Sequence, residues 1–143
     1  MRLVLDTAAM VAALRSDAGA SRQLLLAGLE RRKLTLLVSV PLLIEYEAVL
    51  TRPEHLRAAG ISSDDVGVLL DAVAAVAEGV TLDFSWRPAL PDPDDEMVLE
   101  TAVNGRADAI ATFNKRDFAL VAATFGVATC SPAEALTMWK TTR

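Results

Sequence analysis

Four acidic residues lie within five positions at the start of the stretch 91–100, PDPDDEMVLE, and an apolar run that is typical of a helix follows them directly. They are Asp92, Asp94, Asp95 and Glu96. One interpretation is structural, because Asp is a favoured helix N-cap and negative charge is stabilised near a helix N-terminus. The other is chemical, because one Asp suffices as a cap and crowded carboxylates can concentrate a hard cation such as Mg²⁺ or Mn²⁺. This stretch alone leaves both interpretations open.

Other polar residues stand where short apolar segments end. Asp6 closes the first such segment, Glu45 stands early in the helix expected after the second, and Thr112 and Asn114 close the fourth. Short apolar strands that alternate with helices indicate an α/β fold with a parallel sheet. Ligands in such folds bind beyond the carboxyl ends of the strands. These residues can therefore converge on one edge of the sheet, together with the first turn of the acidic helix.

The hydrophobic pattern predicts the elements that must position these side chains. Strands are expected at 2–5, 34–39, 79–82, 108–112 and 127–130, and helices at 8–14, 20–32, 41–50, 64–77, 117–125 and 132–140, with the acidic helix ending before Gly105-Arg106. Arg52-Pro53 is expected to end the helix 41–50, which places His55 in a polar surface turn. Residues 86–93 form a Pro-rich connection.

Composition limits the possible chemistry. The 143 residues are 52% hydrophobic, which predicts one domain, 1–143, with a substantial core. A net charge of −5 argues against a non-specific nucleic-acid coat. It does not exclude a nuclease, because an acidic metal site lowers the net charge. The lone His55 and lone Cys130 cannot build a His/Cys zinc site, and the sequence has no Gly-rich phosphate loop.

The sequence also predicts a location. The longest uncharged run, residues 118–133, has 16 residues and is broken by Gly126 and Pro132, so we expect no membrane span. The N-terminal strand leaves no room for a signal peptide. One cysteine forms no internal disulfide, which favours a cytoplasmic protein with Cys130 buried.

Four motifs occur in order along the chain. They are a strand that ends in DTA at residues 6–8, a Glu six positions after a Ser across 39–45, Asp95 at the start of an Ala-rich helix, and AIATFNKRDF at 109–118. Together they resemble the PIN domain, and in particular the VapC-type ribonuclease toxins of bacterial toxin–antitoxin pairs. The resemblance covers essentially the whole chain. It implies a PIN-like three-layer α/β/α sandwich around a mainly parallel sheet of four to five strands.

The resemblance also implies Mg²⁺- or Mn²⁺-dependent hydrolysis of RNA phosphodiester bonds. Cations held by carboxylates would neutralise the charge that develops in the transition state. The implied catalytic residues are Asp6, Glu45, Asp95 and Asp117, with Asp6, Asp95 and Asp117 as metal ligands and Thr7, Thr112 and Asn114 in support. Glu45 would orient or deprotonate the attacking water.

Two positions depart from the family pattern. Ala8 replaces the Asn that usually braces the first carboxylate, and Asn114 stands where a fourth acid often stands. Asp117, three residues later, is the candidate for the missing carboxylate. These departures keep open an alternative, in which the domain is a catalytically degenerate PIN-like module that binds protein or RNA.

The resemblance implies an antitoxin partner beside the RNA substrate. The helix 64–77 is more apolar than one buried face requires, which suggests an antitoxin or homodimer interface to which residues 41–59 contribute. Positive charge for RNA would come from Arg15, Arg22, Lys115 and Arg116, although each fits ordinary solvated charge equally well. Trp86 and Trp139 could stack on bases, but packing is the simpler expectation.

Structural roles compete with the catalytic ones. Thr7 is expected to cap a helix, Asp117 could do the same, and Asp92 is expected to be loop charge. Glu45 and Glu47 cannot share a helix face, and the family spacing favours Glu45. A haloacid-dehalogenase phosphatase would need an Asp at position 8, which is Ala. A flavodoxin-like signalling domain would give Glu45 and Asp95 no reason to converge.

Overall fold

The protein is an α/β structure built on one parallel sheet. The computed structural model describes residues 1–82 and 93–142. In that part of the chain the strands are β1 (Arg2–Leu5), β2 (Thr35–Val38), β3 (Glu78–Gly79), β4 (Ala109–Ala111) and β5 (Ala128–Cys130), in the order β3-β2-β1-β4-β5. Every pair of neighbours is parallel, which confirms the predicted fold class.

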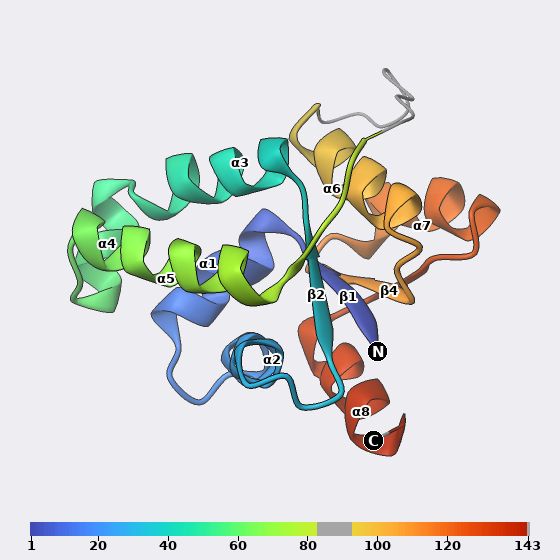
Figure 1. Cartoon of the computed structure of the whole chain (residues 1–143), viewed down its shortest axis with the longest axis horizontal. Helices are drawn as coiled ribbons and strands as arrows, with labels where there is room; N and C mark the ends of the chain where they lie inside the picture. The colour runs from blue at the N-terminus through green and yellow to red at the C-terminus, as the bar shows by residue number, and fades with distance from the viewer. Residues whose placement is uncertain (83–92, 143) are drawn as a thin grey trace.

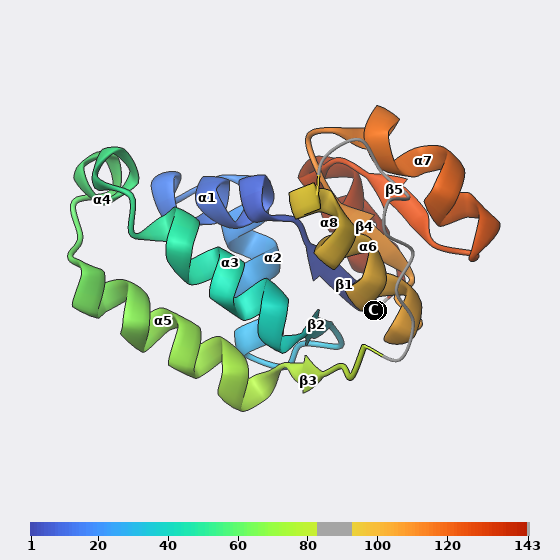
Figure 2. The same cartoon turned by 90° about the horizontal axis from the view of Figure 1, so that it is seen from above.

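Helices cover both faces of the sheet (Figures 1 and 2). They are α1 (Thr7–Arg15), α2 (Ala20–Leu29), α3 (Val40–Leu50), α4 (Pro53–Ala59), α5 (Ser63–Val76), α6 (Pro93–Asn104), α7 (Lys115–Thr124) and α8 (Pro132–Thr142). Helices α2 and α8 pack together below the sheet in Figure 1, and α6 lies above it against β1, β2 and β4. Helix α5 runs alongside α3 at one end of the molecule (Figure 2).

The strand order places a topological switch point between β1 and β4. From β1 the chain adds β2 and then β3 on one side, whereas β4 and β5 extend the sheet on the other side. The loops that leave β1 and β4 therefore diverge from adjacent strand ends. That edge is where open α/β sheets bind ligands.

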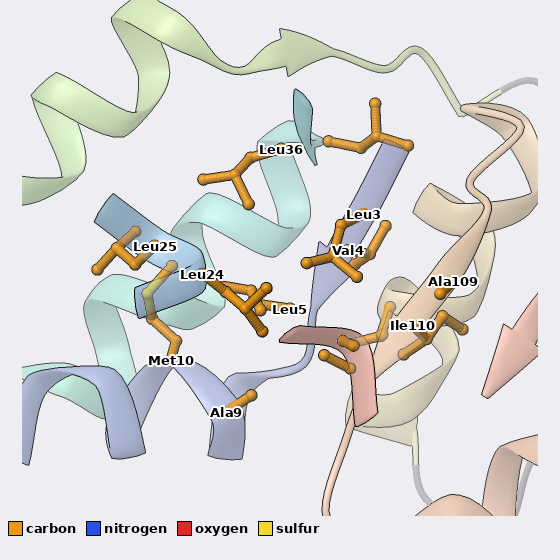
Figure 3. Close-up of a cluster of buried hydrophobic side chains, with 14 of the residues drawn as sticks. Leu3, Val4, Leu5, Ala9, Met10, Leu24, Leu25, Leu36, Ala109 and Ile110 are labelled. Carbon is orange, nitrogen blue, oxygen red and sulfur yellow. The ribbon is translucent and has the colours of Figure 1, made fainter. Parts of the chain in front are cut away.

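Apolar side chains of the sheet and of the helices on both of its faces form the core. The strand residues Leu3, Val4 and Leu5 are almost completely buried. In Figure 3, Leu5 lies beside Leu24 of α2 and close to Met10 of α1. Because residues 3–5 are all apolar, β1 can be buried on both faces, as a central parallel strand requires.

The predicted elements are largely confirmed, and the exceptions have local causes. Pro53 does not stop helical structure: Arg52 is extended with ψ 136, as a residue before proline must be, and Pro53 then opens α4. Helix α2 ends at Leu29 rather than residue 32, because Arg31 and Lys33 adopt positive φ. Strand β3 covers only Glu78–Gly79, whereas residues 79–82 were predicted. Helix α7 begins at Lys115, two residues before the predicted start at Asp117. The predicted connection at 86–92, with Trp86 and Asp92, lies outside the described residues.

Candidate functional site

Asp6 occupies the first position after β1 and is fixed from several sides. Its backbone N–H donates to the carbonyl of Ala111 on β4 at 3.0 Å, and its Oδ1 accepts from Ala9 N at 2.7 Å. Asp6 is thus the N-cap of α1, so the expectation that Thr7 caps this helix is wrong. The carboxylate is only 5% exposed. Burial raises its pKa, while hydrogen bonds from Thr112 and from Ala9 act in the opposite direction.

The turn after β4 lies next to Asp6. Thr112 is fully buried; its side chain bonds to Asp6, and its Oγ1 accepts from Asn114 N at 2.9 Å. The Asn114 side chain in turn donates to the carboxylate of Asp117. Asp117 is half-buried in the first turn of α7, where Asn114 is the N-cap residue. Thr112, Asn114 and Asp117 therefore form one hydrogen-bonded series that begins at Asp6.

Helices α3 and α6 bring two more acids to the same edge. Glu45 lies on α3 and is half-buried, whereas Glu47 is exposed. Asp95 lies in the first turn of α6. The two helices are joined by a buried contact of 2.7 Å between the hydroxyls of Ser39, which caps α3, and Thr101. Because Thr101 also donates to Met97 O, the Ser39 hydroxyl donates to Thr101 while its oxygen accepts from Leu42 N.

These side chains line one pocket, which we call the carboxylate pocket. It has a volume of about 420 Å³ and is lined by Asp6, Thr7, Ala8, Val11, Glu45, Val49, Arg52, His55, Asp95 and Asn114. Three carboxylates and an amide from four separate parts of the chain therefore share one hollow. Asp117 is not among the described residues that line it. Asp92 lies outside the described residues, and the side chain of Asp94 is not described either.

Two cationic or titratable side chains in this pocket were not predicted. Arg52 and His55 enter it from the start of α4, the helix that the sequence analysis missed. His55, expected in a surface turn, is a half-buried helical residue whose Nδ1 is 3.5 Å from Nη1 of Arg15. The signal that could have found them is Pro53, because proline is as typical of the first position of a helix as of a helix end.

Two of the cations that were considered for RNA contacts, Arg22 and Lys115, bond to other groups of the protein. Arg22 donates to the carbonyls of Ala13 and Leu14 at the end of α1, and Lys115 bonds to Glu134 at 2.8 Å. Arg116 is exposed. Trp139 is 5% exposed, and its Nε1 donates to Arg32 O at 2.7 Å, so it packs as expected.

Residues 2–116 match the sequence profile of the PIN domain. The chain belongs to the PIN-domain family. No curated protein matches the sequence closely enough to be named as a relative. PIN domains are generally nucleases that bind nucleic acid and typically use divalent metals, so the family suggests nuclease activity in general.

The donors in the carboxylate pocket suit a hard cation. Carboxylate and amide oxygens come from Asp6, Asp95 and Asn114, and the buried Thr7 hydroxyl has no hydrogen-bond partner among the described residues. Within residues 1–82 and 93–142, no three His, Cys, Asp or Glu side chains are grouped closely enough to hold a metal together. The carboxylates of Asp6 and Asp95, the amide oxygen of Asn114 and the Thr7 hydroxyl are nevertheless oxygen donors of the kind that a hard divalent cation takes together with several waters. None of the described helices is long and apolar enough to cross a bilayer.

Proposed function

We propose that this PIN domain is a Mg²⁺- or Mn²⁺-dependent endoribonuclease that cuts RNA in the carboxylate pocket. The observation that carries the proposal is convergence: Asp6, Glu45 and Asp95 come from three elements far apart in the sequence and line one pocket. That pocket lies at the switch point of a parallel sheet. A structural explanation would have to account separately for each acid.

The residues divide the chemistry between them. Asp6 and Asp95 would hold the cation, and Asn114, held by Asp117, would complete its surroundings with a neutral oxygen. When bound, the cation neutralises negative charge on the phosphodiester and supplies a nucleophile at neutral pH. Glu45, half-buried at the rim, would orient the attacking water and accept its proton. The Thr7 hydroxyl, beside Asp6, would hold a water of the hydrated cation.

Arg52 brings a positive charge to the pocket that Asp6, Glu45 and Asp95 line. A substrate phosphate is an anion and needs a counter-charge where the carboxylates are not fully neutralised. Arg52 is exposed and lines the pocket. A second guanidinium, that of Arg15, lies 3.5 Å from Nδ1 of His55, which also lines the pocket. A guanidinium binds phosphate oxygens through paired N–H donors. We assign Arg52 to the phosphate and His55 to the wall that positions it.

We further propose that the enzyme is the toxin of a toxin–antitoxin pair, that it forms a homodimer and that it acts in the cytoplasm. Val40 and Ile44 on α3 are 69% and 64% exposed, and Val68 on the adjacent α5 is 69% exposed. Large exposed apolar side chains on two packed helices support a protein partner at this surface. The antitoxin would cover it, close to the pocket that Glu45 reaches from the same helix α3.

The proposal is tested by cleavage of labelled RNAs with Mg²⁺, Mn²⁺ or EDTA. We expect metal-dependent cleavage that falls about 10²-fold or more in Asp6→Asn and in Asp95→Asn, since charge aimed at a transition state is worth this much. Asn is as good an N-cap as Asp, so Asp6→Asn should keep α1 intact. Glu45→Gln should also lose turnover, whereas the matched control Glu47→Gln, on the exposed side of α3, should not.

Two results would contradict the proposal in different ways. Full metal-dependent cleavage by Asp6→Asn and Asp95→Asn would remove these residues from the site. Absence of both cleavage and metal binding in the unmodified protein would favour the degenerate binding module. Co-purification of a protein partner with the tagged chain from its native cells, with Ile44→Asp as the interface variant expected to lose that partner, tests the antitoxin proposal separately.

A further inference from the structure

A second pocket adjoins the carboxylate pocket. It has a volume of about 280 Å³ and is lined by Ala12, Ser16, Gly19, Ala20, Ser21, Phe113, Ser131, Pro132 and Ala133. We call it the Phe113 pocket. The two pockets have no lining residue in common, but two pairs of consecutive residues bring them close together. Val11 and Ala12, consecutive on α1, line one each, and Asn114 and Phe113, consecutive in the turn after β4, also line one each.

Phe113 is an aromatic ring left in solvent. It is 62% exposed, although it lies between the buried Thr112 and the pocket-lining Asn114. The rest of the Phe113 pocket is walled by Ala, Ser, Gly and Pro, whose small side chains leave room for a flat ligand against the ring. None of the described residues that line this pocket carries a charge, so its chemistry suits a neutral group and not a phosphate.

Ser21 supplies an unsatisfied polar atom in this otherwise apolar site. The residue is 3% exposed, and its buried Oγ has no hydrogen-bond partner among the described residues. A buried hydroxyl without a hydrogen-bond partner costs free energy of folding, so such groups in native proteins are usually paired with a water molecule or a ligand. A flat neutral ligand with hydrogen-bonding groups on its edge would stack on the ring of Phe113 and form a hydrogen bond with the hydroxyl of Ser21.

We propose that the Phe113 pocket receives an unpaired nucleobase of the RNA strand whose neighbouring phosphodiester lies in the carboxylate pocket. Phe113 stacks on the base, and the Ser21 hydroxyl reads its edge. The inference rests on the proposed ribonuclease function and adds a subsite for one base next to the cut, with a preference among bases set by Ser21. Unstacked bases in single strands are what proteins recognise by aromatic stacking and edge contacts.

The test uses the full-length Asp6→Asn variant, which should bind RNA without cutting it. The probe is a short single-stranded oligouridylate with one 2-aminopurine, placed at each position in turn, because 2-aminopurine fluorescence is quenched by stacking. We expect quenching at one position, loss of that quenching in Phe113→Ala, and Kd weakened on the order of tenfold by fluorescence anisotropy. Phe113→Tyr should restore both. Leu120→Ala, at an 87% exposed apolar residue of α7, is the matched control and should change neither.

Cleavage with Asp6 restored provides the second readout. Ser21→Ala should keep the stacking signal but flatten the preference among RNAs that differ only in the base beside the cut. Unchanged Kd, quenching and base preference in Phe113→Ala and Ser21→Ala would overturn the pocket while leaving the ribonuclease proposal standing. Phe113-dependent quenching without cleavage of any RNA by the unmodified protein would support the pocket and overturn the nuclease. Absence of RNA binding would overturn both.

Discussion

At the scale of single residues, the site depends on how firmly Asp6 is held. The Tyr46 hydroxyl, on a fully buried side chain of α3, donates to the carbonyl of Leu5 at 2.5 Å, one residue before Asp6. Burial, and then the nearby charge of Asp6, raise the pKa of Tyr46, so it remains a neutral donor. The strand end and the helix that carries Glu45 are thereby tied together, which fixes one carboxylate relative to the other.

Arg52 gives a residue-scale prediction about substrate affinity. Arg52→Ala should raise KM for RNA and reduce the slope of log Kd against log salt by about one, because one phosphate contact is lost. The matched control is Arg57→Ala, an exposed arginine on the same helix α4 that does not line the pocket. RNA binding measured by anisotropy over a salt series checks this. Equal slopes for the two variants would remove Arg52 from the phosphate contact.

Single residues also show what the sequence could and could not predict about the site. Asp6, Glu45 and Asp95 were predictable, because Asp6 follows a strand, Asp95 lies in the first turn of a helix, and Glu45 stands six residues after Ser39 as in the family pattern. Arg52 and His55 were missed, because Pro53 fits the end of one helix as well as the start of the next, and the local pattern does not say that both residues reach the pocket of Asp6. The sequence also did not show that Asp117 stays outside the described lining of the carboxylate pocket. Asn114 lines that pocket instead, and its side chain donates a hydrogen bond to Asp117.

At the scale of elements, the ends of helices do most of the positioning. Asp6, Ser39 and Ser62 each cap a helix through a side-chain oxygen. Ser131 and Glu134 exchange hydrogen bonds in the same way at α8, with distances of 2.8 and 3.1 Å. Such caps are visible in a sequence, so helix starts were predicted better than helix ends. The end of α2 depends on the positive φ angles of Arg31 and Lys33, and neither residue type predicts a positive φ.

The capping carboxylate of α8 predicts a pH effect on stability. Glu134 bonds to Lys115 and to Ser131, and these contacts lower its pKa to about 2. A carboxylate whose folded pKa is depressed stabilises the fold above its unfolded pKa and loses that contribution as pH falls toward its folded pKa. Wild-type protein should therefore exceed Glu134→Gln in stability at neutral pH, and the difference should shrink between about pH 4.5 and pH 2. Urea unfolding at a series of pH values checks this, and a difference independent of pH would refute it.

At the scale of the whole molecule, the order of the strands decides which acids meet. The sequence predicted five strands and a parallel sheet, but no local pattern states that β1 lies between β2 and β4. That placement follows from burial, because β1 is apolar on both faces and belongs at the centre. Only then do the loops after β1 and β4 become neighbours, so that Asp6 and Asn114 enter one pocket.

Close packing of α2 on the sheet yields the last prediction, which contrasts two glycines. A Cβ on Gly28 of α2 would lie 2.5 Å from Cγ of the buried Leu36 on β2, whereas a Cβ on Gly67 of α5 would meet nothing within 4 Å. Replacing glycine by alanine in a helix gains up to about 1 kcal/mol. Overpacking a core costs about 1–3 kcal/mol.

Gly67→Ala should therefore raise the free energy of unfolding by about 1 kcal/mol, and Gly28→Ala should lower it by roughly 1–2 kcal/mol. Urea denaturation of both variants beside the unmodified protein measures the two shifts. Because both substitutions add the same methyl group to a helix, a difference in sign can only come from the contact between α2 and β2. A Gly28→Ala variant as stable as Gly67→Ala would mean that Leu36 moves aside at little cost and that this layer is packed less tightly than its buried side chains indicate.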